Sequence, residues 1–100
     1  MDVVNERTRY VLPLTFRDED GTPVTPVGVT VRIDDVASGT AIRAATAINP
    51  VSSTHDLEIT AEENRIINAA NRIELRRVTV HIQGEATGEY LYHVKNLAGV

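Results

Sequence analysis

At 100 residues with a formal net charge of −4, the chain can form one domain with a single core and is too acidic for a nucleic-acid binder that relies on phosphate contacts. It has no cysteine, which excludes disulfides, thiolate metal sites and a cysteine nucleophile. Hydrophobic residues make up 42% of the chain but only 4% is aromatic, so the core must be mostly aliphatic, a composition that favours a β-sheet.

The N-terminal residues predict no targeting segment. Residues 1–7 have neither the basic start nor the apolar run of a signal peptide, and no stretch approaches the roughly 20 apolar residues of a membrane span. We therefore expect a protein made in a cytoplasm. Because residues 1–7 show no clear period, we predict a flexible N-terminal arm there, followed by a single domain over residues 8–100. Such an arm can dock on a neighbour in an assembly, although a frayed terminus is commoner.

Alternation of apolar and polar residues then predicts a series of short strands. The first, residues 8–16, contains Pro13, which lacks the N–H that a central ladder needs. We therefore place this strand at a sheet edge, or with that N position turned to solvent. The period of two recurs at residues 29–33 and 55–60. Residues 40–47 are a weaker candidate, because they hold a single large apolar residue. Their alanines indicate either close approach to another sheet or an exposed edge.

An acidic run, Asp18-Glu19-Asp20, follows the first strand. The pair Asp20-Gly21 and the nearby Pro23 predict a turn. Three consecutive acids also raise the possibility of bound calcium, but an EF-hand loop needs alternating oxygen ligands out to a glutamate at position twelve, and the pattern here stops at Gly21. We therefore predict a solvated turn without a metal at Asp18–Asp20.

One helix is expected in the domain, within residues 60–70. Thr60 and Glu63 have the spacing of a capping box, in which each side chain accepts a hydrogen bond from the backbone N–H of the other residue. A short helix over residues 61–70 would follow, and it would bury Ile66 or Ile67, and Ala70.

The last third of the chain, residues 72–97, predicts a long hairpin around which the rest is organised. Its turn is Gly84-Glu85-Ala86-Thr87-Gly88. An isolated hairpin is at best marginally stable in water, so its apolar rows require a facing layer. The residues expected to point inward are Val78, Val80, Ile82, Tyr90, Tyr92 and Val94, and those expected to point outward are Thr79, His81, Gln83, Leu91, His93 and Lys95.

Five or six strands separated by turn signals roughly every 8 to 12 residues are typical of a β-sandwich or a β-barrel. The strands differ in length and one connection is expected to be helical. We therefore predict an all-β fold, an antiparallel β-sandwich with one short helix.

The three histidines, His55, His81 and His93, are candidate metal ligands. If His81 and His93 lie on adjacent arms of the hairpin, their imidazoles could approach each other, with His55 or Glu89 as a further ligand. A zinc site needs three or four ligands at about 2 Å, and nothing in the spacing selects them. We therefore expect polar surface histidines and assign no metal site.

Pairs of acids and hydroxyl groups predict no catalytic site either. Asp34-Asp35 and Glu62-Glu63 fall in an expected turn and helix start, where acids are favoured for capping and for the helix dipole. Ser52 and Ser53 lie near His55 but lack a nucleophile elbow and an orienting acid. We assign no catalytic and no cofactor-binding residue.

Four segments resemble a group of small structural proteins of tailed bacteriophages and prophages. They are DVASGT at residues 35–40, DLEITAEENRII at 56–67, RVTV at 77–80 and YLYHVKNL at 90–97. The group shows a D-V-x-S-G-T turn, an I-x-x-x-x-N-x-I-I segment after a strand and an ending close to Y-x-V-K-N-L. The resemblance covers most of the chain from about Phe16 onward, and it transfers no catalytic residue.

This resemblance implies an immunoglobulin-like or fibronectin-type sandwich that belongs to a virion. The expected position is the head–tail junction, the tail or baseplate, or the capsid surface. The expected partners are other virion structural proteins, with many symmetric copies in the particle and without nucleic acid, membrane or cofactor. Weak contacts that are repeated around a symmetric particle add up through multivalency.

We therefore predict a non-enzymatic virion protein that mediates protein–protein contacts. The alternative is a ligand- or receptor-binding β-sandwich that recognises a carbohydrate or a cell surface, which would present exposed aromatic side chains. An enzyme ranks last, because no triad, dyad or ligand set has the required spacing.

Overall fold

The computed structural model describes residues 1–83 and 87–97, and this part of the chain is all-β. The predicted helix at residues 61–70 is wrong, because the described residues contain no helix and residues 61–64 form turns. The expected strands are present, together with one that the sequence did not predict, at the N-terminus. The seven strands are β1 (Asp2–Asn5), β2 (Tyr10–Thr15), β3 (Val29–Asp35), β4 (Ala41–Ile48), β5 (Thr54–Ile59), β6 (Ile73–Ile82) and β7 (Thr87–Lys95).

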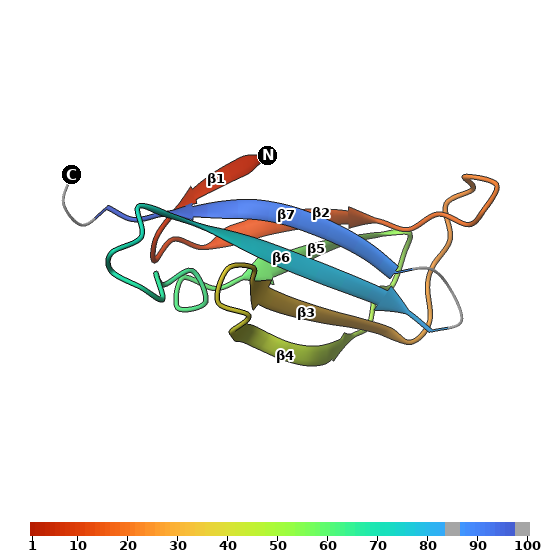
Figure 1. Cartoon of the computed structure of the whole chain (residues 1–100). Coiled ribbons are helices and arrows are strands. Elements are labelled where there is room, and N and C mark those ends of the chain that lie inside the picture. The colour runs from red at the N-terminus through yellow and green to blue at the C-terminus, as the bar shows by residue number, and fades with distance from the viewer. Residues whose placement is uncertain (84–86, 98–100) are drawn as a thin grey trace.

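The strands form two sheets, with five strands in the order β1-β7-β6-β3-β4 and two strands in the order β2-β5 (Figure 1). Every pairing is antiparallel except that of β1 with β7, which is parallel. The predicted two-sheet, mainly antiparallel arrangement is thus confirmed. Strand β6 lies in the centre of the larger sheet, between β7 and β3.

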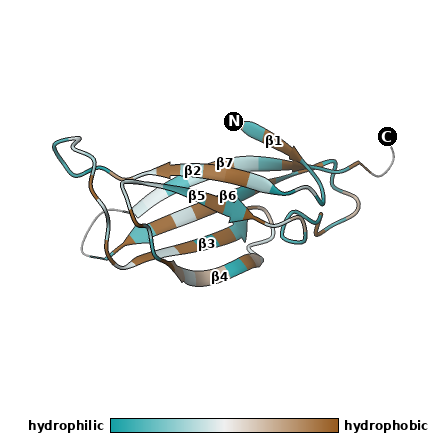
Figure 2. Cartoon of the chain, turned by 180° about the vertical axis from the view of Figure 1, so that it is seen from behind, coloured by the Kyte–Doolittle hydropathy of each residue, from teal (hydrophilic) through white to brown (hydrophobic). Residues whose placement is uncertain are grey.

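The core lies between the two sheets and is almost entirely aliphatic. Alternate residues of each strand point into it, which Figure 2 shows as a succession of hydrophobic and hydrophilic bands along β2, β3 and β6. Burial of apolar area between the sheets is the main stabilising contribution, at roughly 25 cal/mol per Å². The buried hydrophobic residues are Val4, Leu14, Phe16, Val29, Val31, Ile33, Leu57, Ile59, Val78, Val80, Tyr92 and Val94.

The predicted C-terminal hairpin is present as β6 and β7. Val78, Val80, Tyr92 and Val94 are buried as predicted, whereas Tyr90 is 36% exposed. Of its expected turn at Gly84–Gly88, residues 84–86 lie outside the described residues, whereas Thr87 and Gly88 belong to β7. The inward face of β6 also continues toward its N-terminal end with two charged residues, Glu74 and Arg76, in the same phase as the valines.

Residues 1–7, expected to be a flexible arm, include strand β1 in the structure. β1 pairs with β7 from Asp2 opposite Tyr92 to Asn5 opposite Lys95. Val4 is buried in the core, and the Tyr10 hydroxyl donates a hydrogen bond of 2.5 Å to the Asp2 carboxylate. Four residues are too few for a periodic pattern to be recognised in the sequence, so pairing with β7 gives this segment its conformation.

Two of the predicted edges are edges in the structure. In the described part of the chain, β2 pairs with β5 alone, and the exposed Pro13 stands opposite Asp56. β4 pairs with β3 alone, and five of its eight residues are exposed. The register between β3 and β4 shifts near Ile33, which marks a β-bulge or a similar irregularity.

The missing helix has a local cause. The capping box forms as predicted, since the Thr60 N–H donates to Glu63 Oε1 at 2.9 Å and the Glu63 N–H donates to Thr60 Oγ1 at 3.2 Å. In a continuing helix the Ile67 N–H would donate to the Glu63 carbonyl. Here that carbonyl accepts from the Arg76 side chain, and the Ile67 N–H donates to the Glu74 carboxylate. Side chains of β6 therefore replace the backbone ladder.

Gly28 provides a test of the packing at the end of the larger sheet. Its φ is +69°, and a Cβ there would lie 2.6 Å from Gln83 Oε1 and 3.0 Å from Gln83 Cβ. Gly39 also has a positive φ, +73°, but nothing lies within 4 Å of its Cβ position. We expect Gly39→Ala to lower the free energy of unfolding by about 1 kcal/mol and Gly28→Ala by about 1–3 kcal/mol more, because of the added clash. Urea denaturation of both variants measures this difference, and equal losses would show that Gln83 moves aside without cost.

Candidate functional site

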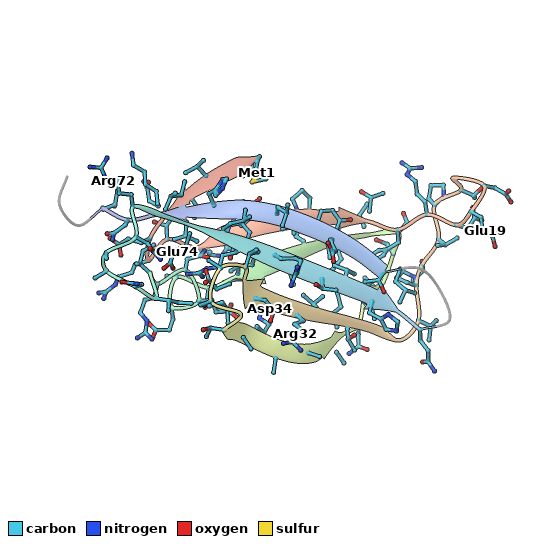
Figure 3. All side chains as sticks on the ribbon, viewed as in Figure 1. Met1, Glu19, Arg32, Asp34, Arg72 and Glu74 are labelled. Atoms are coloured by element: carbon cyan, nitrogen blue, oxygen red, sulfur yellow. The ribbon has the colours of Figure 1, made fainter. Side chains whose placement is uncertain are left out.

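A buried polar cluster lies at one end of the sandwich, where β6 begins. We call it the Arg76 cluster, and it consists of Asp35, Asn64, Glu74 and Arg76. All four residues are at most 7% exposed. Figure 3 shows Glu74 among the crowded side chains at this end, opposite the end that carries Glu19. Buried charges are costly unless they are paired and hydrogen-bonded, so the contacts of this cluster decide what it can do.

The Arg76 guanidinium makes four hydrogen bonds. Nε donates to Asp35 Oδ1 at 3.2 Å, and Nη2 donates to Glu74 Oε1 at 2.8 Å. The other two bonds reach backbone carbonyls of the loop after β5, from Nη1 to Glu63 at 3.1 Å and from Nη2 to Arg65 at 2.7 Å. One side chain thus joins two carboxylates to a loop that has no regular secondary structure of its own.

The Glu74 carboxylate supports the same loop from the other side. It accepts hydrogen bonds from the backbone N–H groups of Ile67 and Asn68 and from the Asn71 side chain, at 2.8–3.1 Å. Burial alone would raise the pKa of Glu74. The donated hydrogen bonds, including that of Arg76, outweigh burial and lower the pKa below the ordinary glutamate value. Glu74 is therefore a carboxylate at neutral pH.

Asn64 connects the cluster to the other parts of the fold. Its Nδ2 donates to the Thr8 carbonyl at 2.8 Å, and its Oδ1 accepts from the buried Tyr92 hydroxyl at 2.8 Å. Its backbone carbonyl accepts from the Arg7 N–H at 2.8 Å. Desolvation by burial raises the pKa of Tyr92 to about 12, although the nearby Arg76 charge acts in the opposite direction. The Tyr92 hydroxyl thus stays protonated and donates.

The turn between β3 and β4 is attached to the cluster through Asp35. Its Oδ2 accepts from the Ser38 N–H at 3.0 Å and from the Ser38 hydroxyl at 2.6 Å, while Oδ1 accepts from Arg76. Among the described residues, every buried side-chain nitrogen or oxygen has a hydrogen-bond partner. The polar groups of the cluster therefore bind one another and position loops.

Sequence reasoning missed this cluster. The sequence pattern places Asp35 in a turn and Asn64 in a helix, and it assigns no role to Arg76. One signal was available, because Glu74 and Arg76 stand two and four positions before Val78 and so share its face of β6. That signal predicts a pair of buried charges, but the partners lie on other segments and are not indicated by it.

The side chains considered as catalytic candidates are separated by the fold. Asp34 and Asp35 point to opposite sides of β3, where Asp34 pairs with Arg32 at 2.9 Å on the outer face (Figure 3) and Asp35 pairs with Arg76 inside. Glu62 forms an exposed ion pair with Arg65 at 3.0 Å. The other candidate residues also engage neighbours of their own. Glu63 pairs with Arg43, the Ser52 hydroxyl donates to the Thr54 carbonyl, and the Ser53 carbonyl accepts from the Phe16 N–H.

The histidines are also apart. In the hairpin, His81 stands opposite Thr87 and His93 stands opposite Leu75, six positions away on β6, or about 20 Å at the rise of a strand. His55 is on β5, opposite Leu14, in the other sheet. Within residues 1–83 and 87–97, no three histidine, aspartate or glutamate side chains are grouped as a metal site requires. The expectation that the hairpin could bring the imidazoles of His81 and His93 close together is thus wrong.

The acidic turn is organised by its own backbone. Asp18 Oδ1 accepts from the N–H groups of Asp20 and Thr22, both at 2.9 Å, and the Gly21 carbonyl accepts from Arg17 at 3.0 Å. One oxygen of the Asp18 carboxylate therefore stabilises the turn by accepting hydrogen bonds from its backbone. Figure 3 places Glu19 at the far end of the molecule from Glu74.

Two of the surface hollows border the loops of the fold. The first, about 620 Å³, lies between the loop after β5 and the start of β4, with Arg7, Ile42 and Ile66 among its lining residues. Beside it, Arg43 donates from Nε to Glu63 Oε2 at 2.6 Å and joins β4 to this loop. The second hollow, about 580 Å³, is more apolar and is lined by Val24, Pro26, Val27 and Ile82, among others.

The edge of β4 is weakly guarded over its second half. Edge strands are usually guarded by charge, proline or a bulge, because their free N–H and C=O groups can pair with another chain. The irregular part of β4 is its first half, whereas Thr46–Ile48 pair regularly with β3. Thr46 and Ala47 are exposed and uncharged, and Arg43 is engaged with Glu63. The second half of β4 thus offers a regular edge bordered by small side chains.

Comparison with known proteins found no match among protein-family models, curated proteins or solved structures. In the part of the chain that the structure describes, no helix has the length and hydrophobicity that crossing a membrane requires.

Replacement of Arg76 tests the cluster. We expect Arg76→Met to lower the free energy of unfolding by about 3–5 kcal/mol, because Asp35 and Glu74 would remain as buried charges without their partner. Arg77→Met is the matched control, since the neighbouring Arg77 lies half-buried on the opposite face of β6. It should cost about 0–1 kcal/mol. Urea denaturation measures both values, and similar losses would contradict a central role for Arg76.

The lowered pKa of Glu74 predicts an acid-dependent loss of stability. A carboxylate whose pKa is lower in the folded state contributes stability that is complete above its unfolded value of 4.5 and is lost as the pH falls through the folded pKa. We expect Glu74→Gln to lower the free energy of unfolding at pH 7 and to flatten its decline below pH 4.5. Glu62→Gln, at an exposed residue, should keep the wild-type pH profile. A Glu74→Gln profile parallel to that of the wild type would refute the assignment.

Proposed function

We propose that this chain is a non-enzymatic structural protein of the virion of a tailed bacteriophage and that it mediates contacts between protein subunits. The observation that carries the proposal is the regular, weakly guarded edge of β4 on a domain whose buried polar groups are used to hold its own loops. Such a domain has strand edges available for other chains. The head–tail junction, the tail or baseplate, and the capsid surface all fit this role.

The sheet order supports an immunoglobulin-like or fibronectin-type fold. In such sandwiches, strands B and E belong to one sheet and strands C, F and G to the other, with C′ added at the edge beside C in some members. We assign β2 and β5 to B and E, and the row β4-β3-β6-β7 to C′, C, F and G. β1 then lies beside G. This assignment gives a letter to six of the seven strands of the described chain.

The phage-like motifs occupy structural positions. In the DVASGT turn, Asp35 binds both Ser38 and Arg76. In the segment after β5, Asn64 binds Tyr92, which belongs to the last motif together with Asn96. Asn96 donates to the carbonyls of Ala69 and Asn71 at 3.1 and 2.8 Å. The residues that carry the resemblance therefore hold one end of the fold, which supports a shared fold with that group.

Chain-to-chain contact through β4 would use main-chain hydrogen bonds. A strand added beside Thr46–Ile48 would extend the five-stranded sheet, and the small side chains on this edge would let it approach closely. Each such contact buries modest area. In a symmetric particle the contact is repeated, and the second and later contacts form at a high effective concentration.

The second candidate is a ligand- or receptor-binding sandwich, favoured by Tyr90. This side chain is 36% exposed and lies with Phe16 and Ile82 at a shallow hollow near the tip of the hairpin. Tyr92, however, is 1% exposed and belongs to the core, so the two tyrosines do not form one aromatic surface. Carbohydrate binding on a glycan array that is lost in Tyr90→Ala would favour this candidate over the first.

Incorporation into particles tests the proposed function. We expect mass spectrometry to find this chain in purified virions of the phage or induced prophage that encodes it. Ala47→Lys should reduce its incorporation several-fold, because a lysine on the β4 edge opposes pairing with another strand. Ala70→Lys adds the same charge at an exposed position of the loop after β5 and should incorporate like the wild type. Absence of the wild-type chain from particles would refute the proposal.

A further inference from the structure

Strand β1 is attached to its sheet by few interactions. It has four residues, and only Val4 among them is buried, while Val3 is 56% exposed. Tyr92 and Val94 of β7 are themselves buried in the core. Removal of β1 from β7 would therefore uncover one small apolar side chain and a row of backbone groups, and would leave the contact between the two sheets in place.

The connection from β1 to β2 is strained. Arg7 has a φ of +57°, and no other non-glycine residue among the described ones has a positive φ. The left-handed region is unfavourable for a residue with a Cβ and persists only where the surroundings impose it. Here the Arg7 N–H donates to the Asn64 carbonyl, which belongs to the firmly held loop after β5. The strain lies at the residue whose conformation folds β1 back onto its own β7.

The groups that bind β1 would bind the same strand from another copy equally well. The Tyr10 hydroxyl binds Asp2, the Lys95 carbonyl accepts from the Glu6 N–H, and the Leu97 N–H donates to the Glu6 carboxylate. The donors and acceptors on the receiving side lie after Arg7 in the chain. A rotation at Arg7 thus separates the strand from its site without altering either.

We propose that β1 is an exchangeable strand, so that residues Asp2–Asn5 of one copy pair with β7 of a second copy and Arg7 is the hinge. Short hinges under strain favour this kind of exchange between identical chains. A reciprocal exchange gives a closed dimer, and a head-to-tail exchange gives a ring or filament. The inference deepens the proposed function and rests on it, since it supplies a link between copies in the particle.

The absence of cysteine from the natural sequence allows a direct test. Val3 and His93 are neighbours in the pairing of β1 with β7. We would mix two full-length variants, Val3→Cys and His93→Cys, under mild oxidation and separate the products on a non-reducing gel. The expected result is a disulfide-linked heterodimer. The matched control replaces His93→Cys by His81→Cys, because His81 lies on β6 opposite Thr87, away from β1. It should give at least about tenfold less heterodimer, since disulfides require Cα atoms within about 7 Å.

Two hinge variants make the test specific. Arg7→Gly removes the strain and should reduce the heterodimer about tenfold, the factor expected for relief of one left-handed residue. Arg7→Pro cannot adopt a positive φ and should increase it. A single chain carrying both Val3→Cys and His93→Cys, oxidised when dilute, should close within one molecule and verifies that this pair can form a disulfide.

The outcomes separate the two proposals. A heterodimer yield no higher than that of the His81→Cys control, in both the wild-type and Arg7→Pro backgrounds, would overturn strand exchange. That result would leave incorporation into virions, measured on particles, unaffected. Exchange in the purified chain combined with absence from particles would retain the exchangeable strand and refute the virion role.

Discussion

The fold depends on one buried interaction, the set of hydrogen bonds that the Arg76 guanidinium makes at the start of β6. Arg76 is fully buried, and it binds Asp35, Glu74 and two carbonyls of the loop after β5. A buried ion pair adds little to the free energy of unfolding compared with well-packed apolar residues in its place. Removal of one of its partners, however, is strongly destabilising. The cluster thus selects one conformation of the loop after β5. It fixes the path of a loop that has neither a helix nor a strand to guide it.

The consequences reach both sheets. The loop held by Arg76 carries Asn64, which binds the Thr8 carbonyl and the Tyr92 hydroxyl, so that the connector before β2 and the interior of β7 are tied to the same point. The turn between β3 and β4 is tied to it through Asp35. Three of the four sequence motifs contribute a partner to these contacts, namely Asp35 at residues 35–40, Asn64 at 56–67 and Tyr92 at 90–97. The polar side chains of these residues are therefore used in building the fold.

The strand edges differ in a way that matters for assembly. β2 carries Pro13, and the outer face of β5 carries Asp56 and Glu58, so the small sheet is guarded. The second half of β4 has no comparable guard. At the other edge of the large sheet, β1 covers β7 with a single buried side chain and a strained hinge at Arg7. Both ends of the five-stranded sheet are thus suited to contacts between chains, one by accepting a strand and the other by exchanging one.

The sequence alone determined that the fold is all-β and has two layers, and it identified most of the core. The reason is that the alternation of apolar and polar residues, seen in β2, β3, β5, β6 and β7, depends only on which side chains avoid water. The edge position of Pro13 followed from its missing N–H. Only the tertiary structure decided the rest. The capping box at Thr60 formed but no helix followed, since long-range partners, Arg76 and Glu74, took the hydrogen bonds that a helix would have used. β1, likewise, has no pattern of its own and acquires its conformation from β7. Local rules describe a residue and its near neighbours, whereas these contacts join segments far apart in the chain.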